Sequence, residues 1–153
     1  RVVHAAHRMI MFSEAATIHE AKFREKPDAY RQQMQSEIMG GLLIPTSTYL
    51  RAQRIRAKFR AEMTDLMADL DAILTPSALT PALKGLSSTG AAAFNAPWSL
   101  IGFPTVTIPS GLTGDRLPLG LQIIASPYDE PRLLGVAEWC EAVLPFEMEP
   151  LFQ

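Results

Sequence analysis

Cysteine is almost absent from this sequence, and that scarcity excludes several classes of small protein. The 153 residues contain one cysteine, Cys140, so the chain can form no internal disulfide and no multi-cysteine metal framework. The chain also lacks a large excess of either positive or negative charge, because 14 basic and 16 acidic residues leave a formal charge of −2. Such a balance provides no broad electrostatic attraction to phosphates, so we expect no direct nucleic-acid binding.

Uninterrupted apolar runs are missing as well. The longest uncharged stretch covers residues 85–114, but Pro97, Pro104 and Pro109 interrupt it. We therefore interpret it as an irregular buried segment and not as a membrane helix. A basic start followed by an apolar core, the pattern of a secretory signal, does not occur. We expect a soluble, cytoplasmic protein without a membrane partner.

Apolar residues are present in sufficient number to build a core, at 48% of the chain. The two halves differ in composition: residues 1–71 carry a net charge of +2, whereas residues 72–153 carry −4 and hold ten of the twelve prolines. Proline and glycine punctuate short elements, so the second half should alternate strands and helices. We expect a single partial domain over 1–153, helical and charged over 1–71.

Three helices are predicted in the first half. The first covers about residues 4–26, and the second runs from about 30 to 39, with Asp28 as its cap and Gly40 and Gly41 as its stop. The third follows Pro45, with Thr46, Ser47 or Thr48 as its N-cap. Apolar residues then recur at spacings of three and four, which predicts one buried stripe of Ala52, Ile55, Phe59, Met63, Leu66 and Leu70.

Three short strands are predicted in the second half, over residues 72–75, 105–108 and 119–124, and they read as apolar on both faces. A short helix should begin at Asn95 and end at Gly102, and a last helix should run from Asp129 to about Leu144 and end at Pro145. Its predicted inner face consists of Leu133, Leu134, Ala137, Trp139 and Cys140. Strands alternating with helices indicate an α/β sheet covered by helices, and so few strands indicate that part of the sheet is missing.

Few side chains are grouped in a way that suggests chemistry. His4 and His7 share a helical face and could bind a metal with Glu14 or Glu20, but the spacing lacks the H-E-x-x-H pattern, and solvated histidines are the favoured interpretation. We expect no metal and no cofactor.

The segment 84–90 invites a serine–lysine hypothesis, because a desolvated lysine can act as base to a serine. We favour a polar loop there. The basic cluster over 51–60 is interpreted as a solvated face, or else as the source of one arginine that clamps a carboxylate. Trp98 and Trp139 are expected in the core, and Cys140 is expected to be an inert buried thiol.

Several sequence segments resemble, in the same order along the chain, the C-terminal part of the amidase signature family. This family includes the A subunit of glutamyl-tRNA amidotransferase. The segments are Asp71–Pro76, Pro97–Gly111 and Leu117–Ile124, preceded by Tyr49–Arg56, and the resemblance covers roughly residues 36–144. It implies the C-terminal part of a large mixed β-sheet covered on both faces by helices. It also implies hydrolysis of amide bonds by a Ser–cis-Ser–Lys triad.

That triad belongs to the family's N-terminal half, so the resemblance implies no catalytic residue in this chain, which alone should be inactive. The string Ser87–Ala91 only mimics the family's Gly/Ser-rich element, because it lacks the flanking double glycines and lies elsewhere.

The resemblance gives three candidate substrate-binding residues: Arg56, Asn95 and Trp98. Arg56 falls where glutamine-using members place an arginine for the substrate carboxylate. Two departures speak against glutamine: Ser99 replaces a frequent asparagine, and alanines occupy residues 91–93, where an acidic residue is expected. An apolar acyl pocket is the better prediction.

The sequence therefore favours the C-terminal part of an amidase, which completes the sheet and walls the substrate pocket. Its expected partners are a small-molecule amide and the missing N-terminal part of the same enzyme, and a homo-oligomer is compatible with the sequence. One alternative is the ammonia-releasing A subunit of a tRNA-dependent amidotransferase. An alternative of another class is a non-catalytic interaction domain derived from the amidase fold.

Overall fold

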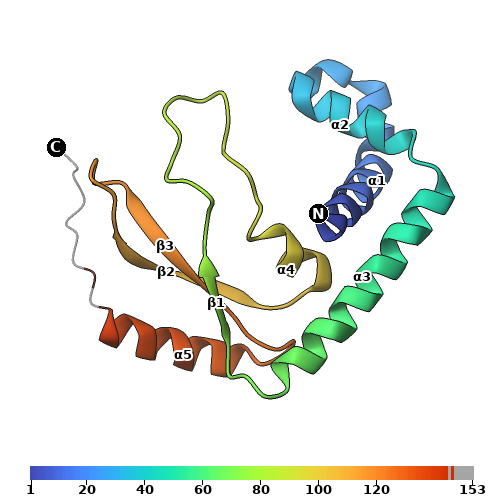
Figure 1. Ribbon diagram of the computed structural model, residues 1–153. Coiled ribbons are helices and arrows are strands. Elements are labelled where there is room, and N and C mark those ends of the chain that lie inside the picture. Colours follow the sequence, from blue (N-terminus) through green and yellow to red (C-terminus); the bar gives the residue numbers. More distant parts are fainter. Residues whose placement is uncertain (145, 147–153) are drawn as a thin grey trace. The chain divides into compact units, whose positions relative to one another are not determined.

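A computed structural model describes residues 1–144 and 146 (Figure 1). The chain separates into two compact units, Arg1–Ala61 and Glu62–Gln153. The first contains helices α1 (Val2–Glu25) and α2 (Gln32–Leu42), a short 3₁₀ turn η1 (Pro27–Ala29) and most of α3 (Thr46–Met67). The second contains β1 (Ile73–Pro76), α4 (Ala96–Ile101), β2 (Thr105–Leu112), β3 (Pro118–Ile124) and α5 (Glu130–Val143).

The first unit is built on the close packing of α1 and α2. Ala6, Ile10 and Ala16 of α1 and Ile38 of α2 are buried. Gly41 lies against the backbone of Phe12 and the side chain of Ala16 so closely that a Cβ atom at this position would collide with both. The small residues therefore determine how near the two helices approach.

Three predicted helix boundaries in this unit are wrong. Asp28 lies within η1 and does not cap α2, whose N-cap is Arg31 without a side-chain hydrogen bond. Gly40 and Gly41 do not stop α2, because Gly41 is required inside it for helix packing. The third helix begins at Thr46 itself, with the Pro45 carbonyl accepting the Thr48 and Tyr49 N–H groups, so no Thr or Ser hydroxyl serves as its cap.

The three strands of the second unit form an antiparallel sheet in the order β1-β3-β2. Gln122 of β3 lies between Thr75 of β1 and Thr107 of β2 in the register. The predicted end of the second strand at Ile108 is too early, since β2 continues through Pro109 to Leu112. Pro109 is tolerated because the register shifts between Pro109 and Gly111 and β2 is an outer strand of this sheet.

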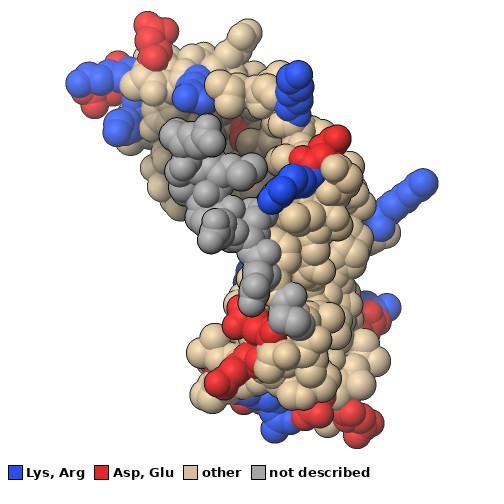
Figure 2. Space-filling model, turned by 90° about the vertical axis from the view of Figure 1, so that its left-hand side faces the viewer, with Lys and Arg blue, Asp and Glu red and all other residues tan. Residues whose placement is uncertain are grey.

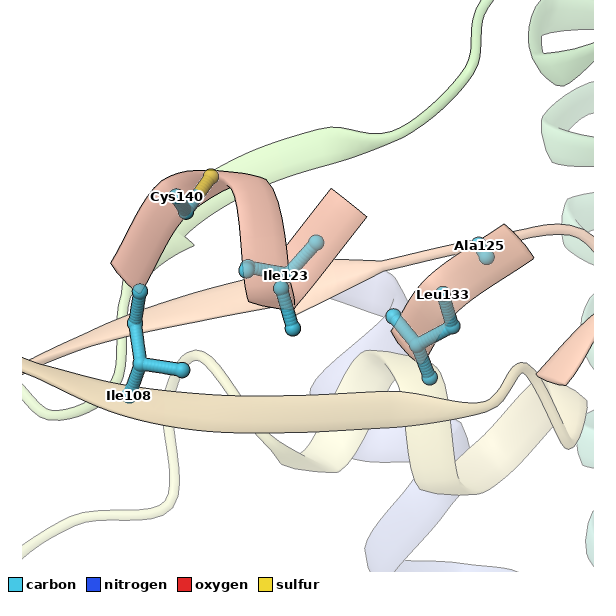
Figure 3. Close-up of a cluster of buried hydrophobic side chains, with 6 residues drawn as sticks. Ile108, Ile123, Ala125, Leu133 and Cys140 are labelled. Carbon is cyan, nitrogen blue, oxygen red and sulfur yellow. The ribbon is translucent and has the colours of Figure 1, made fainter. Parts of the chain in front are cut away.

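Helices pack on both faces of this sheet. On one face, Leu133, Ala137 and Cys140 of α5 form a buried cluster with strand residues (Figure 3). Side chains of successive strand residues point to opposite faces. Ile123 belongs to that cluster, so its neighbour Gln122 faces the other side, where it contacts the residue that precedes α4. The predicted α/β class, with a sheet covered on both faces, is confirmed.

Coverage of the sheet is nevertheless uneven. On β2, Val106 and Ile108 are shielded while Thr105 and Thr107 are exposed. On β1 the pattern reverses, because Ile73 and Thr75 are half-buried and Leu74 is 51% exposed. Each face is therefore covered over only one of the two outer strands.

Several predicted core residues lie at the surface. Leu134 and Trp139 of α5 are exposed, because the helix buries only residues 133, 137 and 140. Leu66 and Leu70 of the predicted α3 stripe are also exposed, whereas Ala52 is buried. Trp98 and Cys140 are buried as predicted. Pro145, predicted to end α5, lies outside the described residues.

No helix within the described part of the chain is both long and apolar enough to cross a membrane.

Candidate functional site

A buried amide occupies the centre of the sheet face opposite α5. Gln122 of β3 is 3% exposed and is the one buried polar residue in the part of the chain that the structure describes. Its Oε1 accepts a hydrogen bond from the Thr75 hydroxyl at 3.1 Å, and its Nε2 donates to Asn95 Oδ1 at 3.1 Å. The side chain thus connects β1, β3 and the start of α4.

A hollow of about 490 Å³ opens between β3 and the segment that follows β1; Thr75 lines it, but Gln122 does not. Ser77 donates its backbone N–H to the Gly120 carbonyl at 2.9 Å, and Gly120 leaves no room for a Cβ atom beside Ser77. All the residues that line the hollow are uncharged; they are Leu74, Thr75, Pro76, Ser77, Ala78, Leu79, Thr80, Pro81, Ala82, Ser110, Pro118, Leu119, Gly120 and Leu121. Such walls suit an uncharged and mostly apolar group with one or two hydrogen-bonding atoms.

Two of the three candidate substrate-binding residues belong to the second unit. Asn95 occupies the N-cap position of α4, as predicted, but its side chain does not cap the helix and accepts the bond from Gln122 instead. Trp98 is 8% exposed, and its ring lies 6.2 Å from the ring of Phe103. Arg56 lies in the first unit, half-buried on α3. The roles of these residues in substrate binding stay predictions.

The segment 84–90 is a loop, as the sequence predicts. Gly85 and Gly90 adopt positive φ angles of 90° and 83°, and the Ser88 hydroxyl accepts a hydrogen bond from the Gly90 N–H at 3.1 Å. The hydroxyl is thus engaged in a local turn, which is typical of serine in loops.

His4 and His7, predicted to be solvated, are half-buried on α1. Within the described ranges, no three His, Cys, Asp or Glu side chains gather closely enough to hold a metal ion. Burial, with a smaller contribution from His4, lowers the pKa of His7. Figure 2 shows basic side chains in blue and acidic ones in red, with both signs present on the face in view.

Comparison with known proteins identifies the family. The Amidase family model matches residues 2–134, so the similarity begins well before the predicted 36. The chain belongs to the amidase family. The predicted resemblance depends mainly on the sequence segments 71–76, 97–111 and 117–124. These segments form most of β1, α4, β2 and β3.

Relatives in the amidase family include components of larger enzymes. The A subunit of glutamyl-tRNA(Gln) amidotransferase from Parvibaculum lavamentivorans is 34% identical over 109 residues, covering 67% of this chain and 22% of the relative. The corresponding protein of Pelagibacter ubique is 30% identical over 136 residues, and the match covers 81% of this chain and 28% of the length of that relative. The chain thus spans between a fifth and a third of the length of these relatives.

A solved structure described as an amidase has the same arrangement. It superposes with a TM-score of 0.81 at 28% identity, and the match covers 93% of this chain and 35% of that structure. The predicted amidase signature fold is confirmed by this match.

Sequence reasoning missed Thr75 and Gln122 as members of a site. The available signal was a glutamine between apolar neighbours in the string Leu121–Ile124, where a polar side chain must find a partner when the strand is buried. Its partners Thr75 and Asn95 are 47 and 27 residues away, and no local pattern reveals such pairs.

Proposed function

We propose that this chain is the C-terminal part of an amidase that hydrolyses carbon–nitrogen bonds in small amides. The observation that carries the proposal is the match of residues 2–134 to the Amidase family, together with the superposition on a solved amidase over 93% of the chain. The catalytic triad would lie outside this chain, in the part of the relatives that the chain does not span.

The chain's own contribution would be to complete the sheet and to form one wall of the substrate pocket. The hollow between β3 and the segment after β1 supports this role, because its lining offers apolar surface and a few hydroxyl groups without a charged side chain. We propose that it receives the acyl part of an uncharged amide. Asn95 and Trp98 do not line this hollow, so their proposed role in substrate binding depends on the resemblance alone.

A second candidate function is the A subunit of a tRNA-dependent amidotransferase. The curated relatives that carry this name at 30–34% identity favour it. Glutamine would then be the ammonia donor, and Arg56 would bind its carboxylate. Ser99 and the alanines at 91–93 speak against this assignment, since they replace polar groups expected around glutamine.

The test is an ammonia-release assay on the longest natural protein that contains this sequence. Aliphatic and aromatic primary amides are compared with glutamine at equal concentration. We expect the uncharged amides to be hydrolysed with the higher kcat/KM. A clear preference for glutamine would favour the amidotransferase component, and the absence of any turnover would favour a non-catalytic interaction domain.

Residues 1–153 alone should release no ammonia from any of these amides, because no serine and lysine of this chain lie in the family's catalytic motifs. The same assay, with Ser88→Ala and Lys84→Ala variants as controls, measures this. Turnover that disappears in either variant would overturn the prediction and place a nucleophile in the loop.

The small-molecule amide and the N-terminal part of the enzyme are the partners that we propose. Four further statements stay predictions. They are the assembly of a homo-oligomer, the absence of nucleic-acid and membrane partners, the location in the cytoplasm and the description of residues 1–153 as one partial domain.

A further inference from the structure

Residues 77–95, which we call the β1–α4 loop, form a long connection without helix or strand. Connections of this length inside compact units are uncommon and usually serve a function. The first part of the loop, residues 77–82, forms one wall of the uncharged hollow. What holds the loop in place therefore determines the shape of the hollow.

The strand before this loop and the last residue of the loop both contact one side chain, that of Gln122. Thr75 lies two residues before the loop begins, and Asn95 is its last residue. The Gln122 amide accepts a hydrogen bond from the first and donates one to the second, each at 3.1 Å. We propose that Gln122 is a positioning residue that holds both the strand from which the β1–α4 loop starts and the last residue of that loop.

The chemistry of the amide explains why one side chain can do this. A glutamine carries an acceptor and a donor on the same planar group, so it can bind a hydroxyl and an amide oxygen at once. Gln122 is almost completely buried, and a buried amide that loses a partner incurs a desolvation penalty. The sheet therefore favours the arrangement in which Thr75 and Asn95 both remain bound.

The hydrogen bond from Ser77 N–H to the Gly120 carbonyl continues the β1–β3 pairing by one residue, close to Gln122. The loop thus leaves the sheet beside the buried amide. In the parent enzyme, this attachment would set the position of the pocket wall; that consequence rests on the proposed function.

The sequence provides a direct test of loop attachment. Lys84 is the only lysine or arginine between Arg60 and Arg116, so trypsin can cut the β1–α4 loop at one place. Arg116 lies in the turn between β2 and β3 and serves as a reference site in the same digestion. Mass spectrometry of a limited digestion of the longest natural protein that contains this sequence gives the ratio of the two initial cleavage rates at these sites.

Thr75→Val removes the hydroxyl and keeps the shape, and Asn95→Ala removes the other partner. We expect each to raise the Lys84-to-Arg116 ratio roughly two- to tenfold, the range of one ordinary hydrogen bond. Thr75→Ser should restore the original ratio. The matched control is Thr107→Val, because Thr107 lies opposite Gln122 on the other neighbouring strand, and the Gln122 amide bonds to Thr75 and Asn95 instead.

Three results would overturn the proposal. The ratio could stay unchanged in both Thr75→Val and Asn95→Ala, or Thr107→Val could raise it equally. Thr75→Ser could also behave like Thr75→Val, which would exclude the hydroxyl as the cause. Because the digestion does not measure amide hydrolysis, its failure and the failure of the proposed function are distinguishable.

Discussion

At the scale of single residues, the neighbouring glycines Gly40 and Gly41 of α2 have different surroundings. Gly41 lies against Phe12 and Ala16, whereas a Cβ atom at Gly40 would meet open space. Gly41→Ala should destabilise the chain by roughly 1–3 kcal/mol, the usual cost of overpacking. Gly40→Ala should stabilise it by roughly 0.5–1 kcal/mol, because alanine loses less backbone entropy in a helix.

Urea unfolding followed by helical circular dichroism measures both effects on the free energy of unfolding. The two variants add the same methyl group one residue apart, so each is the control for the other. Equal effects of the two substitutions would mean that the close approach of α1 and α2 does not limit stability.

Arg56 gives a second prediction at this scale, for the full-length enzyme. Arg56→Lys keeps the positive charge but loses the planar fork that binds a carboxylate through two hydrogen bonds. If Arg56 clamps a substrate carboxylate, kcat/KM should fall for carboxylate-bearing amides and stay unchanged for neutral ones. Steady-state kinetics on one amide of each class measures this; equal losses, or none, would assign Arg56 to the solvated face of α3.

At the scale of elements, α5 presents two adjacent leucines in opposite environments. Leu133 is 4% exposed within the core cluster, and Leu134 is 61% exposed. Leu133→Ala should cost roughly 2–5 kcal/mol of the free energy of unfolding, because it opens a cavity against the sheet. Leu134→Ala should change it by less than about 0.5 kcal/mol.

The measurement is again urea unfolding, with Leu134→Ala as the matched control for loss of the same side chain. Similar effects of both variants would contradict the assignment of the buried face of α5.

Element types could be predicted from the sequence more reliably than their limits. The run Thr105–Ile108 predicts a strand correctly because β-branched residues dominate it, yet the extension past Pro109 depends on β2 lying at the edge of the sheet. Gly41 reads as a helix stop, and only the neighbouring helix α1 explains why it continues one. Trp139 reads as core because of its size, whereas the packing of α5 leaves it exposed.

The sequence predicts residues of the candidate site only where they lie in or beside a family motif. Asn95 and Trp98 lie in or beside a string that resembles the family, so the sequence indicates them directly. The Thr75–Gln122–Asn95 contacts depend on strand order, because they join residues brought together by the placement of β3 beside β1. Tertiary pairing of this kind leaves no periodic signal in the sequence.

In the second unit, helices cover the sheet unevenly, and this predicts that the chain self-associates. Leu74 and Leu119 are exposed beside the hollow, as are Leu79 and Leu83 of the β1–α4 loop. Both outer strands also offer unpaired backbone groups, which are templates for pairing with another strand. We expect residues 1–153 to associate, or to be recovered with the rest of the parent enzyme bound.

Light scattering over a range of concentrations, with an intact-mass measurement for a co-purifying fragment, tests this. As a control, Leu74→Lys and Leu119→Lys together should reduce the association by placing charge on the exposed area. A monomer at every concentration that binds no hydrophobic dye would favour the independent interaction domain.

The strand order has a further consequence for how the protein is made. β3 is the last of the three strands in the chain but lies between the other two, so neither β1 nor β2 has its partner until residues 118–124 have been synthesised. Chains emerge from the ribosome N-terminus first, and strands without a partner are prone to aggregate. The apolar cover from α5 follows within a few residues of β3. A pause of the ribosome after β2 has left the exit tunnel, but before β3 has left it, would therefore prolong the exposure of both outer strands. Translation speed at that stage should influence the yield of correctly folded protein.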